Sequence, residues 1–231
     1  MRKDQTPPRF IALGININRL LITFIPSILF LGVGIITGYI FGIKPTFLLR
    51  DIASIAKINP LYGFFTTIGS FLLFAAAAVC LFSAITLRQL KSKVTFNFLM
   101  YSGILSVYLA FDDMLLFHDY IAPIYLNIPE NFILASILIA FIVYLLKFYK
   151  SILATNYQFF VLSILFFAIS QFVDMIPKQW LFGGLYGSSH ILGEEVPKWL
   201  GITSWLSYFC CYCYDLFLNI LSRGSQQSGN T

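Results

Sequence analysis

Charged residues are scarce in this sequence. Lys, Arg, Asp and Glu together make up 11% of the 231 residues, against about 25% in a typical soluble domain. Hydrophobic residues make up 58%, and the mean hydropathy is +0.82. So few charges exclude an ordinary soluble globular protein, because its surface could not be covered with polar groups. The composition predicts an all-α, polytopic membrane helical bundle.

Cysteine and histidine are also few, with four and two residues respectively. Cys80, Cys210, Cys211 and Cys213 all fall in apolar stretches, where the disulfide framework of a secreted domain is not expected. We therefore interpret them as reduced packing residues. The sequence contains no H-E-x-x-H motif, no Glu-x-x-His pair of the kind found in di-iron bundles, and no internal repeat of 20–50 residues.

The basic residues form short clusters beside apolar runs instead of one continuous patch, so the net charge of +5 does not indicate nucleic-acid binding. The apolar runs predict six transmembrane helices, at about residues 20–43, 62–87, 95–119, 131–147, 157–176 and 197–221. With both termini cytoplasmic, ten of the 15 basic residues lie inside, and eight of the ten acidic residues lie outside. This bias follows the positive-inside rule and predicts a multi-pass protein of the plasma membrane, the bacterial inner membrane.

We expect residues 1–221 to form a single transmembrane domain and residues 222–231 to form a flexible tail. The first apolar run is too long for a cleaved signal peptide and lacks a small-x-small site, which predicts a retained span. Gly34, Gly38 and Gly42 recur at intervals of four and would share one stripe of that helix. Such a stripe permits close helix packing, either within the chain or with a second membrane protein or copy.

The stretch YLAFDDMLLFHDYIAP, residues 108–123, places four ionisable side chains in an apolar run. The interval from Lys93 to Asp112 corresponds to about 28 Å of helix, close to the thickness of the hydrocarbon core. The group therefore lies near the outer interface of the predicted topology. On a continuous helix, Asp112 and Asp119 would be nearly eclipsed, with Asp113 and His118 on either side of that line.

The same charge sorting brings further acids and the second histidine to the outer face. Carboxylates and imidazoles that converge between helices provide the ligands of divalent metal ions such as zinc, manganese or iron, and such an ion could activate water for hydrolysis. The candidate metal ligands are Asp112, Asp113, His118, Asp119, Asp174, His190, Glu194 and Glu195.

Two short segments, FDDMLLFHD and GEEVPKWLG, resemble paired signatures of an uncharacterised family of bacterial multi-pass membrane proteins. The first signature is D-[DE]-x4-H-[DE] at the end of one span. The second is E-E-x2-[EK]-x2-G at the start of a later span. Asp119 stands where the pattern usually has Glu, and Lys198 stands at the position of a third acid. The resemblance implies a common site and no defined activity.

Three functions remain open from the sequence. The first is a metal site at the outer leaflet, with or without hydrolysis, in which Asp112, His118 and Glu194 are the first ligands to test. The second is a non-catalytic assembly subunit that uses the glycine stripe. The third is an ion-coupled carrier in which Asp112 and Asp174 titrate, because ionisable groups within membrane segments commonly bind ions or protons.

Overall fold

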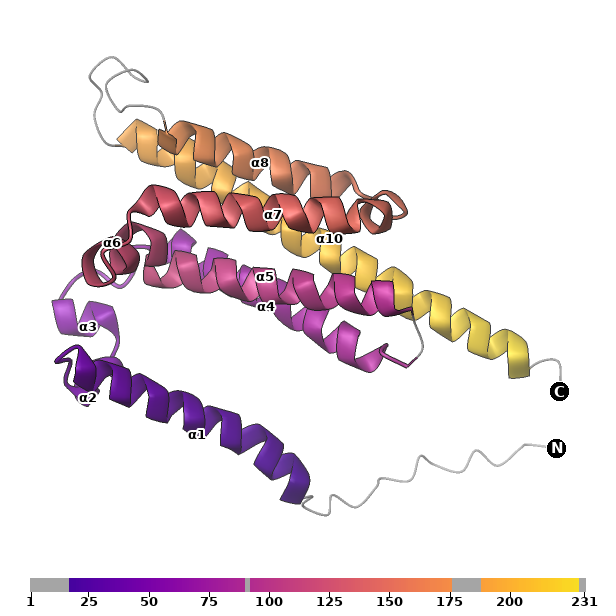
Figure 1. Cartoon of the computed structure of the whole chain (residues 1–231), viewed down its shortest axis with the longest axis horizontal. Coiled ribbons are helices and arrows are strands. Elements are labelled where there is room, and N and C mark those ends of the chain that lie inside the picture. The colour runs from indigo at the N-terminus through magenta and orange to yellow at the C-terminus, as the bar shows by residue number, and fades with distance from the viewer. Residues whose placement is uncertain (1–16, 90–91, 176–187, 229–231) are drawn as a thin grey trace. The chain divides into compact units, whose positions relative to one another are not determined.

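The computed structural model describes residues 17–89, 92–175 and 188–228, and the regular secondary structure in these ranges is entirely helical (Figure 1). The elements are α1 (Ile17–Ile40), α2 (Pro45–Leu48), α3 (Ile52–Ala56), α4 (Phe64–Thr86), α5 (Lys93–Leu115), the π-helix η1 (Phe117–Ile121), α6 (Ala122–Tyr125), α7 (Glu130–Leu153), α8 (Gln158–Met175) and α10 (Ser188–Ser228). The prediction of an all-α fold is confirmed for this part of the chain.

The chain divides into a smaller unit that ends at Tyr62 and a larger unit that begins at Gly63. In the smaller unit, α1 ends at Ile40, and Gly42 lies beyond it with φ +68°. The expected stripe of three glycines on one helix is therefore wrong at Gly42, which forms a turn. A Cβ atom at Gly38 would lie 2.5 Å from Leu48 Cδ1 of α2, while one at Gly34 would meet nothing within 4 Å.

Four helices of the larger unit, α4, α5, α7 and α8, are long and apolar enough to cross a membrane. Their positions agree with four of the six predicted spans, although α7 continues six residues beyond the expected end, to Leu153. In α1, the apolar segment is the shorter Ser27–Ile40. The 41 residues of α10 correspond to about 60 Å at 1.5 Å per residue. The six-span topology and its orientation stay predictions, as does the single-domain boundary at residue 221.

Helix α10 packs against both α4 and α8, and α5 packs against α4 and α7. The core between them is aromatic. Trp205 of α10 is fully buried, with ring centroids 5.6 Å from Phe160 of α8 and 5.0 Å from Phe209. The ring centroid of Phe98 in α5 lies 6.1 Å from that of Tyr144 in α7. These large rings exclude lipid and water from the centre of the helix bundle.

Buried polar groups in this core bond across helices. Trp205 Nε1 donates to Ser106 Oγ at 2.8 Å, and the Ser163 hydroxyl donates to the backbone oxygen of Gly201 at 2.9 Å. Such interhelical hydrogen bonds help to fix the register of helices in a membrane, where unpaired polar groups are costly. Gly201 also permits close approach of α8, because a Cβ atom there would lie 2.9 Å from the ring of Phe167.

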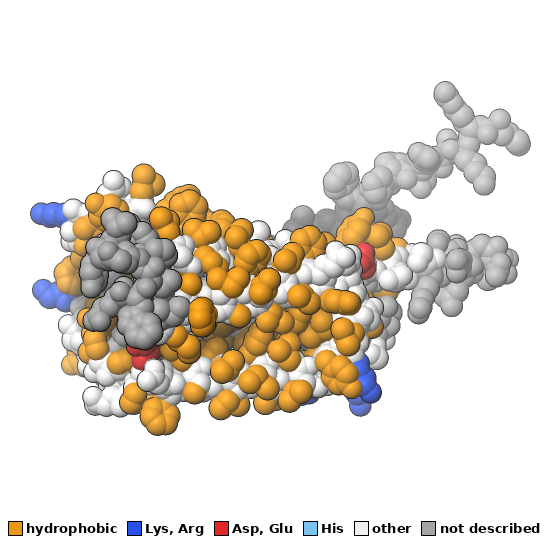
Figure 2. Space-filling view, turned by 90° about the horizontal axis from the view of Figure 1, so that it is seen from above, with side chains coloured by type: hydrophobic (Ala, Val, Ile, Leu, Met, Phe, Trp, Pro, Cys, Tyr) orange, Lys and Arg blue, Asp and Glu red, His pale blue; other side chains and the backbone are white. Residues whose placement is uncertain are grey.

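Figure 2 shows one face, on which hydrophobic side chains predominate and the visible Lys, Arg, Asp and Glu side chains lie toward the ends. The exposed apolar residues include Leu138 and Ile139 of α7 and Phe172 of α8. An apolar surface of this extent is unfavourable in water and suits contact with lipid.

Candidate functional site

The end of α5 differs from the prediction of an uninterrupted helix to residue 119. Leu116 adopts a left-handed conformation, φ 51° and ψ 47°, and its N–H donates to the backbone oxygen of Asp112. The chain then enters η1. Asp112 and Asp119 therefore do not lie on one helical line, and this part of the prediction was wrong. Leucine gives no sequence signal for such a turn, since positive φ is uncommon without Gly, Asn or Asp.

The turn places the His118 ring between two carboxylates, and we call Asp112, His118 and Asp119 the histidine cluster. His118 Nδ1 lies 2.7 Å from Asp112 Oδ2, and the His118 backbone N–H donates to Asp112 Oδ1 at 3.1 Å. The other ring nitrogen, Nε2, lies 3.2 Å from Asp119 Oδ1. Asp112 thus fixes both the backbone and the ring orientation of His118.

These carboxylates raise the pKa of the His118 imidazole above its usual value of 6.5. The main cause is the hydrogen bond to Asp112; partial burial acts in the opposite direction, and the charges of Asp112, Asp119 and Glu130 add to the increase. A neutral imidazole can donate from one ring nitrogen only, whereas the imidazolium donates from both. The geometry therefore favours the protonated ring.

Exposure increases along the histidine cluster. The side chain of Asp112 is 9% exposed, that of His118 20%, and that of Asp119 50%. A buried carboxylate is thereby joined to a solvent-accessible one through an imidazole. His118 and Asp112 share a hydrogen bond along which a proton can pass, and His118 Nε2 lies within ion-pair distance of the Asp119 carboxylate.

Asp113 belongs to a second group, because consecutive helical residues point about 100° apart. Its Oδ1 lies 3.2 Å from Lys198 Nζ of α10, and its Oδ2 accepts a hydrogen bond from Ser70 of α4 at 2.9 Å. Lys198 also contacts Glu195 Oε1 at 2.7 Å. We call Ser70, Asp113, Glu195 and Lys198 the lysine cluster, and it joins α4, α5 and α10.

The remaining three candidates are Asp174, Glu194 and His190. Asp174 is partly exposed near the end of α8 and forms no hydrogen bond or ion pair with the described residues. Glu194 is half-buried in α10. His190 lies on the same helix, but its side chain is outside the described part of the structure.

Sequence reasoning did not place Ser70, Glu130 or Lys198 among the candidate site residues. Ser70 carried no signal, since a serine in an apolar helix usually bonds its own backbone, as Ser70 also does with Thr66. Glu130 follows Pro129 as a first-turn acid of α7, which reads as a helix-end residue. Only the packing of α7 against η1 brings its charge to His118.

The fit to a metal ion is partial. His118 Nε2 and Asp119 Oδ1, 3.2 Å apart, have the separation of two ligands on one ion with bonds of about 2.0–2.2 Å. Asp112 would then orient the His118 ring through its other nitrogen, Nδ1, as carboxylates that hydrogen-bond a metal-bound histidine do at many metal sites. Among the side chains that the structure describes, however, no group of three His, Cys, Asp or Glu residues could hold an ion.

Fold and site together define a helical protein with four helices suited to crossing a membrane and a polar, titratable end. The chain belongs to the family described as a domain of unknown function, DUF8692, whose model matches residues 21–212. That range includes both clusters. No curated protein and no solved structure matches the chain. The particular sequence signatures and the bacterial source stay predictions.

Proposed function

We propose that this protein binds and releases a proton at the histidine cluster, as an ion-coupled membrane protein. The observation that carries the proposal is the contact of both His118 ring nitrogens with carboxylate oxygens, at 2.7 and 3.2 Å. Asp112 holds the ring, His118 carries the proton, and the exposed Asp119 exchanges it with solvent. Chains of Asp, Glu and His perform this role in proton-dependent membrane proteins.

The six-span topology forms part of the proposal. With both termini cytoplasmic, the histidine cluster faces the outside of the plasma membrane, where the external pH would set its protonation. Loss of the proton would weaken the contact of His118 with Asp119 first, because Asp112 can still accept from Nδ1–H of a neutral ring. The end of α5 and η1 would then be free to change conformation.

A direct test is the titration of His118 by NMR in the detergent-solubilised full-length protein. The chain has two histidines, so the His190→Gln variant leaves His118 as the single labelled imidazole. We expect a titration midpoint above 6.5, lowered more by Asp112→Asn than by Asp119→Asn, since the Asp112 hydrogen bond is the main cause of the shift. A midpoint at or below 6.5 would contradict the proposal.

Coupling to transport is tested in liposomes that contain the purified protein. Proton entry after an external acid pulse should be slower for Asp112→Asn than for the wild type. A matched control is Asp51→Asn, which changes an exposed acid that precedes α3 and lies outside the histidine cluster. Equal proton entry in Asp112→Asn and wild type would reject the carrier function.

A divalent metal site is the second candidate, favoured by the 3.2 Å separation of His118 Nε2 and Asp119 Oδ1. Here the ion would replace the proton between these two atoms, and the remaining ligands would be water or substrate, as required for hydrolysis. Zinc, manganese and iron are tested separately by thermal shift. An increase in melting temperature that His118→Gln abolishes supports this candidate, and no metal-dependent shift rejects it.

A further inference from the structure

One lysine lies within a helix suited to crossing a membrane instead of beyond its end. Lys147 is exposed, and α7 continues past it to Leu153, which corresponds to about 9 Å along the helix axis. Helix α7 is one of the four that are long and apolar enough to cross a membrane, and its neighbouring residues Val143 and Leu146 are exposed. The Lys147 ammonium therefore lies near the boundary between lipid hydrocarbon and headgroups.

Two aromatic rings hold the Lys147 ammonium against the bundle. Its nitrogen lies 3.9 Å from the centre of the Tyr101 ring of α5 and 5.4 Å from the centre of the Phe148 ring, which is buried. The negative face of an aromatic ring attracts a cation at such distances. Tyr101 itself is 49% exposed, so the ammonium and this ring share one outward surface. The position of the charge is therefore fixed by α5 as well as by α7.

The described residues provide no carboxylate for this ammonium. Among the ion pairs between described side chains, none includes Lys147, and an aromatic ring offers only the partial negative charge of its face. An ammonium without a counter-ion is costly at the edge of the hydrocarbon. An anion from outside the chain would lower this cost, and lipid phosphates lie at that level of a membrane.

The surrounding side chains suit a lipid in particular. The Tyr101 hydroxyl belongs to the ring that the ammonium covers, so one phosphate group can accept from both donors at about 2.7–3.0 Å. Helices α5 and α7 run in opposite directions (Figure 1), and one turn deeper along them Ile104 and Val143 are exposed. These two apolar side chains continue the same surface and offer contact to an acyl chain, which a soluble anion would leave uncovered.

We propose that Lys147 and Tyr101 bind the phosphate of an anionic membrane phospholipid, with its acyl chain against Ile104 and Val143. The lysine supplies the charge. The tyrosine ring positions the lysine, and its hydroxyl donates a second hydrogen bond. A zwitterionic lipid such as phosphatidylcholine binds more weakly, because its own cation already neutralises its phosphate. The site lies toward the opposite end of α5 from the histidine cluster and does not depend on the proposed proton function.

The experiment uses delipidated full-length protein in detergent and measures ligand binding by native mass spectrometry. The ligands are phosphatidylglycerol, phosphatidylcholine and the soluble ester glycerophosphoglycerol. The variants are Lys147→Gln, Lys147→Arg and Tyr101→Phe.

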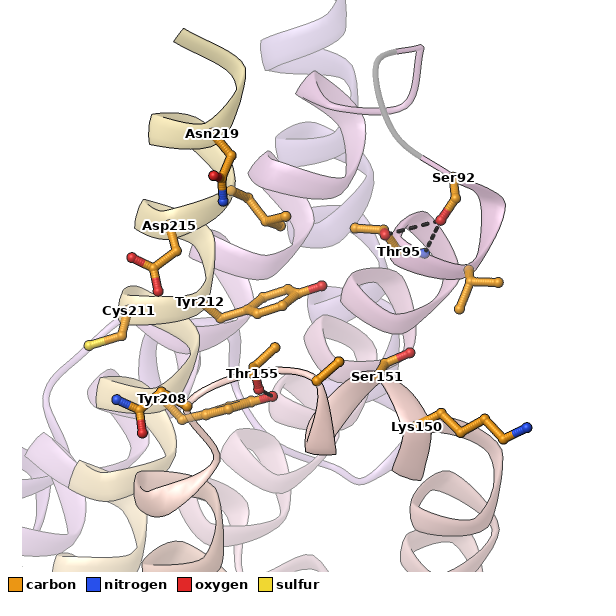
Figure 3. Close-up of a pocket in the computed structure, with 14 residues that line it drawn as sticks. Ser92, Thr95, Lys150, Ser151, Thr155, Tyr208, Cys211, Tyr212, Asp215 and Asn219 are labelled. Carbon is orange, nitrogen blue, oxygen red and sulfur yellow. Dashed lines mark hydrogen bonds between the residues drawn. The ribbon is translucent and has the colours of Figure 1, made fainter. Parts of the chain in front are cut away.

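Lys150→Gln is the matched control. Lys150 is an exposed lysine on the next turn of α7, so its loss changes the net charge of this end by the same amount. It lines a neighbouring pocket, where Figure 3 shows its side chain pointing away from Tyr208 and Tyr212 of α10. Its ammonium is farther from an aromatic ring than that of Lys147, at 5.8 Å from the centre of Tyr149.

We expect Lys147→Gln to weaken the binding of phosphatidylglycerol about tenfold, as loss of a charge-assisted hydrogen bond does. Lys147→Arg should retain the binding, because a guanidinium keeps the charge and also stacks on an aromatic ring. Tyr101→Phe keeps the ring and removes the hydroxyl, and it should weaken binding about threefold. Lys150→Gln should change the affinity by less than about twofold, as expected for a screened surface charge.

Equal losses of affinity in Lys147→Gln and Lys150→Gln would overturn the proposal, since the lysines would then act only through the general positive charge of this end. Equal affinities of the wild type for phosphatidylglycerol and phosphatidylcholine would overturn it as well. If glycerophosphoglycerol binds as tightly as the lipid, the acyl chain contributes nothing and a lipid site is rejected.

Discussion

Removal of the Lys198 charge should destabilise the helix bundle strongly. Lys198 Nζ contacts Asp113 at 3.2 Å and Glu195 at 2.7 Å, and the side chains are 26%, 13% and 33% exposed, respectively. Lys198→Met retains the apolar stem but leaves two carboxylates without their cation. The half-buried Asp113 keeps only its hydrogen bond from Ser70.

The size of the expected loss of stability follows from the intermediate burial of these three side chains. Breaking a fully buried ion pair costs about 3–5 kcal/mol, whereas a surface pair contributes about 0–1 kcal/mol. We expect Lys198→Met to lower the free energy of unfolding by about 2 kcal/mol. The double variant Lys198→Met with Asp113→Asn should recover about half of this loss, since the uncompensated, half-buried Asp113 carboxylate is then gone.

The assay is reversible unfolding in mixed micelles with increasing SDS, followed by circular dichroism of the helices. Lys147→Met is the control. Lys147 interacts with the Tyr101 ring at 3.9 Å, and an exposed cation–π contact is worth about 0.5–1 kcal/mol. The reasoning is refuted if Lys198→Met costs no more than Lys147→Met, or if the double variant is as unstable as Lys198→Met alone.

Two other changes test the site and the packing. The His118 pKa is raised on folding, so its stabilisation is complete below pH 6.5 and is lost as the pH rises through the folded-state pKa. The stability difference between wild type and His118→Gln should decline over that interval, by at most about 1.4 kcal/mol per pH unit; a difference that does not change with pH would contradict this. Gly201→Ala should cost about 1–3 kcal/mol by overpacking, because its Cβ would lie 2.9 Å from Phe167. Gly34→Ala, with open space around it, should be neutral or stabilising in the same denaturation assay, and equal losses would reject the packing argument.

Hydrophobic runs of the required length predicted the positions of α4, α5, α7 and α8 to within a few residues at most ends. The end of α7 was the main exception. Lys147 and Lys150 were expected to terminate that span, yet the helix continues to Leu153. Lys147 lies within it, with its ammonium nitrogen 3.9 Å from the centre of the Tyr101 ring of α5, and long basic side chains near membrane interfaces can keep their stems on apolar surface.

Composition and charge order by themselves determined that the chain is helical, suited to a membrane, and polar around residues 112–119 and 194–195. Tertiary structure decided which of those residues meet. The left-handed Leu116 turned His118 back onto Asp112, and the packing of α4, α5 and α10 paired Asp113 with Ser70 and Lys198. The physical reason is that hydrophobic length is a local property of the sequence, whereas contacts between charged groups depend on turn geometry and helix register, which the whole bundle fixes.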